Sequence, residues 1–125
     1  ANKMVQTNFE NMVKMSFSNL FSESSKTLYK LKFKAALNEA LKTPVQGYIA
    51  CQEGMRIRSN KFKILLSLGC KKLIIIGEKD PVIDKENLLI ETKGTTIKTV
   101  IFSEGHMSHI ENEAEFLHSI MHFIE

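Results

Sequence analysis

Hydrophobic positions divide the chain into a helical first half and a second half in which strands and helices alternate, with the change near Gly69. Hydrophobic residues that recur every three or four positions predict an amphipathic first helix, with Val5, Phe9, Met12 or Val13, and Leu20 on one side. The serine-rich break at 22–25 predicts the cap of a second helix, whose apolar stripe is Tyr29, Phe33, Ala36 or Leu37, and Ala40.

Two shorter helical segments complete the first half. Thr43 and Pro44 end the second helix and start a third over about residues 45–58, because proline is tolerated at a first helical position. Residues 61–68 predict one or two helical turns that end at Gly69.

The second half begins with residues 73–76, an unbroken apolar run that predicts a parallel strand buried on both faces. Asp84 is the expected N-cap of a helix that Gly94 ends, and residues 99–102 predict a second strand. A closing helix over 114–124 is expected to cover one sheet face with Phe116, Leu117, Ile120, Met121 and Ile124. The predicted fold class is α/β: a helical half, 1–68, followed by a βαβα unit, 69–125, with a two-stranded parallel sheet.

Two parallel strands alone leave unpaired edges and an apolar face without a partner. We therefore expect further strands to come from polypeptide N-terminal to residue 1, from a second copy of this chain, or from both. A homodimer that buries a sheet edge or the helices of the first half is one expected form.

Composition excludes several classes of protein. The chain is 43% hydrophobic and 25% charged, without an apolar run of about 18 residues, so we expect a soluble protein and no membrane association. Its 17 basic and 14 acidic residues are scattered, which disfavours nucleic-acid binding. Cys51 and Cys70 form no CxxC pair and no signal peptide opens the sequence, so we expect free thiols and a cytoplasmic location.

The candidate chemistry lies in the two loops that follow the predicted strands. Asp80 stands in Gly-Glu-Lys-Asp-Pro after the first strand, and His106 stands in Gly-His-Met-Ser-His after the second. Adjacent parallel strands place such loops side by side, where ligand sites of open α/β sheets lie. An aspartate beside a histidine can fix the imidazole tautomer and stabilise its charged form, as in a nucleophile-activating triad.

The segments LIIIGEKDPVID and VIFSEGHMSHIENEAEFLHSIMHFIE resemble the last third of an α/β-hydrolase, from the acid strand to the final helix. The resemblance covers about residues 69–125 and implies that Asp80 is the triad acid and His106 the triad base. Residues 1–68 stand where the family inserts its helical cap, and residues 46–51 and 54–56 resemble the return of a cap into the core.

The sequence departs from the family in lacking any G-x-S-x-G motif. The nucleophile and the oxyanion donors are therefore expected in a missing N-terminal segment, and this chain alone is expected to be inactive. The resemblance implies that the complete protein is a serine hydrolase of a small ester-like or similar acyl substrate, with no cofactor. The same fold also hosts carbon-carbon hydrolases, dehalogenases and haloperoxidases, and a noncatalytic interaction module is the alternative from another class.

Each candidate also has a structural interpretation. Asp80 can serve as a turn residue before proline, and His106 as a polar loop residue near the final helix. His109 is expected to be structural, and Glu111 is expected to start the closing helix without a chemical role.

The remaining candidates are assigned structural roles or none. His118 and His122 lack a third ligand, so no metal site is predicted. Cys51 lacks the elbow of a nucleophile. Core packing, rather than lining a substrate pocket, is expected for four methionines: Met4, Met12, Met15 and Met55.

Overall fold

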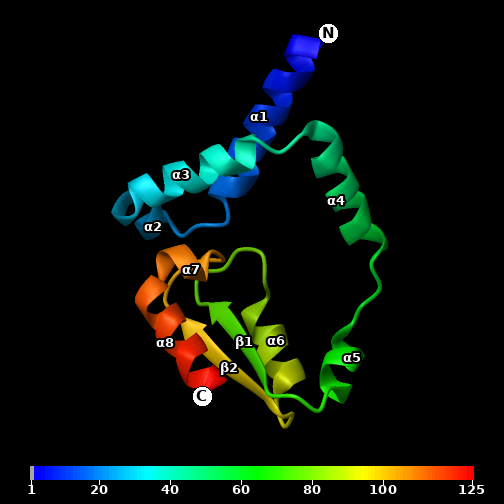
Figure 1. The fold of residues 1–125 in the computed structure, drawn as a ribbon, viewed down its shortest axis with the longest axis vertical. Coiled ribbons are helices and arrows are strands. Elements are labelled where there is room, and N and C mark those ends of the chain that lie inside the picture. Colours follow the sequence, from blue (N-terminus) through cyan, green and yellow to red (C-terminus); the bar gives the residue numbers. More distant parts are fainter. Residues whose placement is uncertain (1) are drawn as a thin grey trace.

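The computed structural model describes residues 2–125, with side chains from Thr7 onward, so the predicted roles of the Met4 and Val5 side chains lie outside the described residues. The chain forms mixed α/β structure that is mostly helical (Figure 1). Its elements in order are α1 Asn2–Ser18, α2 Glu23–Leu28, α3 Lys30–Leu41, α4 Val45–Ile57, α5 Phe62–Ser67, β1 Lys72–Gly77, α6 Lys85–Thr92, β2 Ile97–Phe102, α7 Ser108–Glu111 and α8 Glu113–Ile124.

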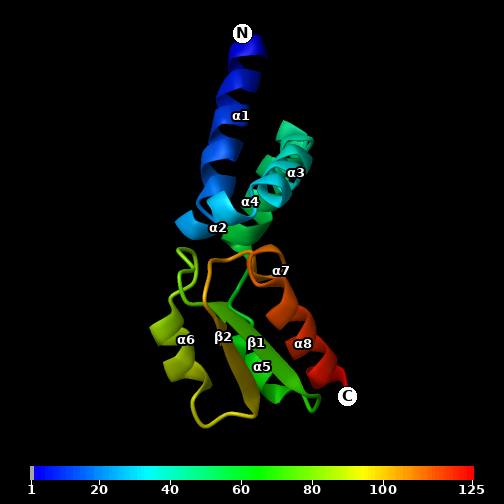
Figure 2. The same cartoon turned by 90° about the vertical axis from the view of Figure 1, so that its left-hand side faces the viewer.

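The two strands form a parallel pair, which confirms the predicted two-stranded sheet. Lys72 is opposite Ile97 and Gly77 is opposite Phe102, so both strands end at the same level. Helices α6 and α8 lie on opposite sides of the pair (Figure 2). The predicted caps of α6 are confirmed, because Asp84 accepts a hydrogen bond from the Asn87 amide and Gly94 adopts a φ of 76° just after the helix.

The expectation that the first strand is fully buried is wrong for its centre. Leu73, Ile74 and Ile75 are only half-buried, whereas Ile76 is 2% exposed. Within the described residues β1 has one paired edge, so its other side has no neighbouring strand to cover it. The closing helix differs from the prediction in the same way, because three of its stripe residues are exposed: Leu117, Met121 and Ile124.

The predicted second helix is two helices in the structure. Tyr29 has non-helical backbone angles of φ −111° and ψ 33°, which separate α2 from α3. On either side of this break, Ser25 of α2 is completely buried, and Phe33 of α3 packs against Phe17 and Phe21 of the α1 region.

Helices α4 and α5 form an arm along one side of the molecule (Figure 1). No residue of α4 is buried, although Tyr48 packs edge-on against Phe9 at 5.4 Å between ring centroids. The residues that resembled a cap returning into the core therefore do not enter it. The Lys72 ammonium donates to the Leu68 carbonyl at 2.6 Å and so ties the end of α5 to the start of β1.

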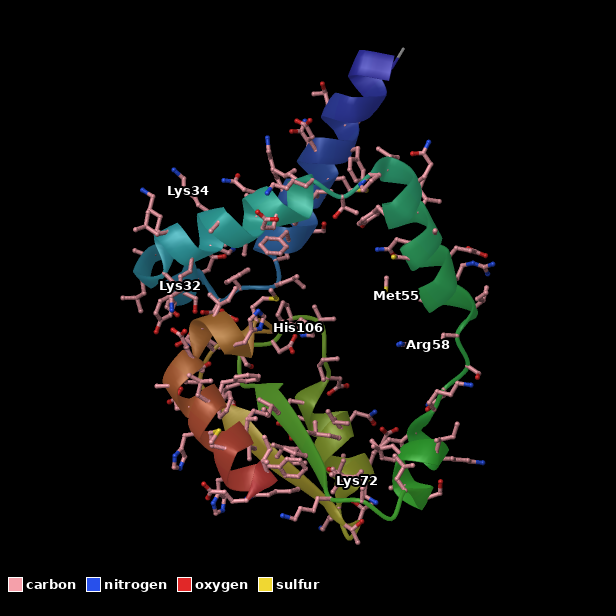
Figure 3. The ribbon with its side chains drawn as sticks, viewed as in Figure 1. Lys32, Lys34, Met55, Arg58, Lys72 and His106 are labelled. Atoms are coloured by element: carbon pink, nitrogen blue, oxygen red, sulfur yellow. The ribbon has the colours of Figure 1, made fainter. Side chains whose placement is uncertain are left out.

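The predicted core role of the methionines is wrong for the three that can be assessed. Met12, Met15 and Met55 are 38%, 65% and 53% exposed, and Figure 3 shows Met55 on the outlying α4 arm. The buried apolar core is small and consists of Phe9, Val13, Phe21, Ile76, Ile97 and Phe102.

The accessible surface is large for the mass of the chain. It measures 9028 Å², about one third more than the roughly 6,800 Å² expected of a compact monomer of this mass. Much of the apolar surface of this chain is therefore unpartnered in the described structure. Among the described residues, no helix combines the length and the apolar character needed to cross a bilayer.

Candidate catalytic pair at the strand ends

Asp80 is held rigidly in the loop that follows β1. The loop is tied to the end of β2, because the Glu78 amide donates to the Phe102 carbonyl at 2.7 Å. Asp80 Oδ1 accepts hydrogen bonds from the amides of Val82 at 2.7 Å and Ile83 at 3.1 Å. The side chain is only 5% exposed. These bonds fix the carboxylate independently of its contact with His106.

His106 lies in the loop that follows β2, between the βαβ unit and the helices α1–α3 (Figure 3). Its backbone amide donates to the Leu20 carbonyl at 2.8 Å, which connects the loop to the helical half. The imidazole is 36% exposed and is thus accessible to a molecule from outside.

The two sequence-predicted site residues meet directly. His106 Nδ1 and Asp80 Oδ2 are 2.7 Å apart, and because a carboxylate can only accept, the imidazole donates from Nδ1. This arrangement leaves Nε2 as the nitrogen with a free electron pair, which is the atom a general base requires. No serine among residues 7–125 forms a hydrogen bond with the imidazole.

A cavity of about 270 Å³ adjoins the pair. Asp80, His106 and Ser108 line it together with the end of β1 and apolar residues of the α6 region. A second hollow, of about 870 Å³, lies between the α1–α2 connection and the loop at Pro81. Both lie at the strand ends, where the sequence predicted a ligand site.

Next to the Asp80–His106 pair, the Glu104 carboxylate binds serine hydroxyl groups and a lysine ammonium group. Its carboxylate accepts hydrogen bonds from Ser22 and from Ser24 at 2.7 Å, and Lys79 Nζ lies 3.2 Å from it. The Ser22 hydroxyl lowers the pKa of Glu104 below its ordinary value against the opposing effect of desolvation, and Ser24 and Lys79 lower it further. The ionised carboxylate therefore joins the helical half to the loop before His106.

The sequence did not predict where Glu111 lies in the structure. It is 1% exposed and ends α7 rather than starting the closing helix. Its carboxylate accepts from the amides of Ser22 at 2.8 Å and Met107 at 2.9 Å. The sequence carries no signal for the Ser22 contact, because the two residues are 89 positions apart.

The other candidates lie away from the pair. The His109 ring contacts Phe116 edge-on, with the centroids 6.3 Å apart, and His118 and His122 are exposed on α8. Cys51 and Cys70 are free and exposed. In the described part of the chain, no group of three or more metal-ligating side chains comes together.

Comparison of the chain with protein-family models and with curated proteins gives no match.

Proposed function

We propose that this chain supplies the acid and the base of a Ser-His-Asp triad in a hydrolase that cleaves an ester or similar acyl bond. The observation that carries the proposal is the 2.7 Å hydrogen bond between His106 Nδ1 and Asp80 Oδ2 at the ends of two adjacent parallel strands. Asp80 orients the imidazole, and His106 removes the proton of a serine nucleophile and later returns it to the leaving group.

The serine and the oxyanion donors come, in this proposal, from polypeptide N-terminal to residue 1. The half-buried β1 has an unpaired edge within the described residues, and the cavity that contains Asp80 and His106 runs along this strand. An added strand beside β1 would cover its apolar residues and bring a nucleophile to the same end of the sheet.

A noncatalytic interaction module is the second candidate, because large apolar side chains of the first helices are exposed. Met15, Leu28 and Leu31 are 65%, 73% and 83% exposed. Large exposed apolar side chains are a feature of surfaces that bind another protein.

Hydrolysis of a chromogenic acyl ester tests the two candidates against each other. The chain extended upstream to its native start is compared with residues 1–125, each with and without His106→Ala and Asp80→Asn. We expect activity only in the extended protein, with kcat lowered about 10⁶-fold by His106→Ala and about 10⁴-fold by Asp80→Asn.

His109→Ala is the matched control, because this histidine lies three residues away and contacts Phe116 instead of Asp80. An extended protein that hydrolyses no acyl substrate would favour the interaction module. Hydrolysis by residues 1–125 alone would contradict the proposal that the nucleophile lies outside them.

A further inference from the structure

Glu111 is a fully buried acidic side chain that forms no ion pair with a lysine, arginine or histidine among residues 7–125. A carboxylate removed from water is strongly destabilising unless hydrogen bonds replace its hydration. Here two backbone amides do so, those of Ser22 and Met107. The side chain therefore acts as a connector between two backbone segments.

The segments that Glu111 joins are the α1–α2 connection and the loop that carries His106. Ser22 belongs to the first, and Met107 directly follows His106 in the second. The same segments are also joined by the 2.8 Å hydrogen bond from the His106 amide to the Leu20 carbonyl. The backbone amides of His106 and Met107 are thus both linked to the helical half by hydrogen bonds, the first directly and the second through Glu111.

Gly105 shows how closely the two segments approach. A Cβ atom at this position would lie 2.8 Å from the Ser22 nitrogen, 2.9 Å from the Leu20 oxygen and 2.9 Å from Glu111 Oε2. Real Cβ contacts are longer, so any side chain here would push the segments apart. The loop before His106 is pressed against residues 20–22, with the Glu111 carboxylate at the same contact.

We propose that Glu111 is a positioning residue for His106 and that, through it, the helical half holds the imidazole against Asp80. The inference rests on the proposed function of the Asp80–His106 pair. The Asp80 carboxylate is fixed locally, by the amides of Val82 and Ile83, whereas the His106 loop is joined to the helical half through Leu20 and Glu111. Loss of the Glu111 carboxylate leaves the buried Ser22 amide and the half-buried Met107 amide without their acceptor, and the His106 loop relaxes away from Asp80.

The test reads the imidazole directly and needs no substrate. The ring ¹⁵N chemical shifts of His106 report which nitrogen carries the proton, and they are measured on residues 1–125 at a pH where the ring is neutral. The original chain is expected to favour the Nδ1–H tautomer, and Asp80→Ala is expected to abolish that preference. Glu111→Ala is expected to abolish it as well, and Glu111→Gln, which keeps one acceptor oxygen, to reduce it.

Glu113→Gln is the matched control, because Glu113 is exposed, lies two residues further on and pairs with Lys32. It is expected to leave the tautomer unchanged. If both Glu111 variants unfold, as judged from the amide spectrum of β1 and β2, Gly105→Ala provides a second route, because its Cβ would displace both residues 20–22 and the Glu111 carboxylate from the His106 loop. Its expected result is the same loss of preference.

Full retention of the Nδ1–H preference in folded Glu111 variants, or in Gly105→Ala if those unfold, would overturn the inference and leave the Asp80–His106 pair intact. Absence of the preference in the original chain would instead remove the basis of the proposed function, so the two failures can be told apart.

Discussion

Asp80 uses its two carboxylate oxygens for different purposes. Oδ1 accepts from the amides of Val82 and Ile83, which is the role of a turn residue, and Oδ2 faces His106 Nδ1. The two interpretations that the sequence left open are therefore compatible. The turn supplies the rigidity that an orienting acid needs, because a fixed carboxylate holds the imidazole at a smaller cost in entropy.

Glu104 gives the first prediction at the scale of a single residue. Hydrogen bonds from Ser22, then those from Ser24 and Lys79, lower its pKa in the folded chain. A lowered pKa in the folded state stabilises the protein above the ordinary value of about 4.5, and this stabilisation is lost as the pH falls through the folded-state pKa. We expect the free energy of unfolding to decrease below pH 4.5, with Glu104→Gln weakening that dependence.

Urea denaturation at a series of pH values from 7 to 3 measures this effect. Glu91→Gln is the control, since it removes an exposed carboxylate at the end of α6. If the free energy of unfolding depends on pH equally in Glu104→Gln and in the original chain, the hydrogen bonds of Glu104 with Ser22, Ser24 and Lys79 do not contribute to that dependence.

The end of β1 is packed against the loop after β2 at a distance that only glycine allows. A Cβ atom on Gly77 would lie 2.1 Å from the Gly105 oxygen and 2.6 Å from the Glu104 oxygen. Both obstacles are backbone atoms, which cannot move aside as a flexible side chain can. The contact between these two elements brings Asp80 and His106 together.

Gly77→Ala is therefore expected to destabilise the chain by about 1–3 kcal/mol, the usual cost of overpacking. Gly54→Ala is the matched control: Gly54 lies inside α4, nothing would stand within 4 Å of its Cβ, and alanine is expected to stabilise the helix by about 0.8–1 kcal/mol. Urea denaturation of both variants measures the difference. Unchanged stability in Gly77→Ala would contradict the close packing of the two loops.

The whole molecule exposes more surface than a compact chain of this mass normally does, and many large apolar side chains are part of it. On α8, Leu117, Met121 and Ile124 follow one another at helical spacing and are 57%, 58% and 68% exposed. The total accessible surface of 9028 Å² exceeds that of a compact monomer by more than a standard protein–protein interface buries on one partner. Burial of this surface would stabilise an assembly.

Association in solution is the prediction at this scale. We expect light scattering to give a mass above 14.2 kDa that rises with concentration, and the double variant Leu117→Gln with Met121→Gln to lower it. Ile90→Gln is the control, because Ile90 is 72% exposed on α6, on the side of the strand pair opposite α8 (Figure 2), and it is expected to leave the mass unchanged. A folded chain of 14.2 kDa at every concentration would contradict the prediction.

The sequence by itself determined the elements whose signals are local. The run at residues 73–76, the Asp84 cap and the left-handed Gly94 each depend on interactions within a few residues, so periodicity and capping preferences locate them. The adjacency of Asp80 and His106 also followed, because parallel strands of equal register bring their following loops to one edge.

Only the tertiary structure decided what depends on residues far apart in the chain. The break at Tyr29 lies between the buried Ser25 of α2 and the packed Phe33 of α3, and Glu111 meets Ser22 across 89 positions. Neither contact leaves a trace in local hydrophobic spacing. The half-buried centre of β1 likewise depends on which neighbours are present, because a strand pattern specifies what a residue prefers to contact and not whether that contact is made.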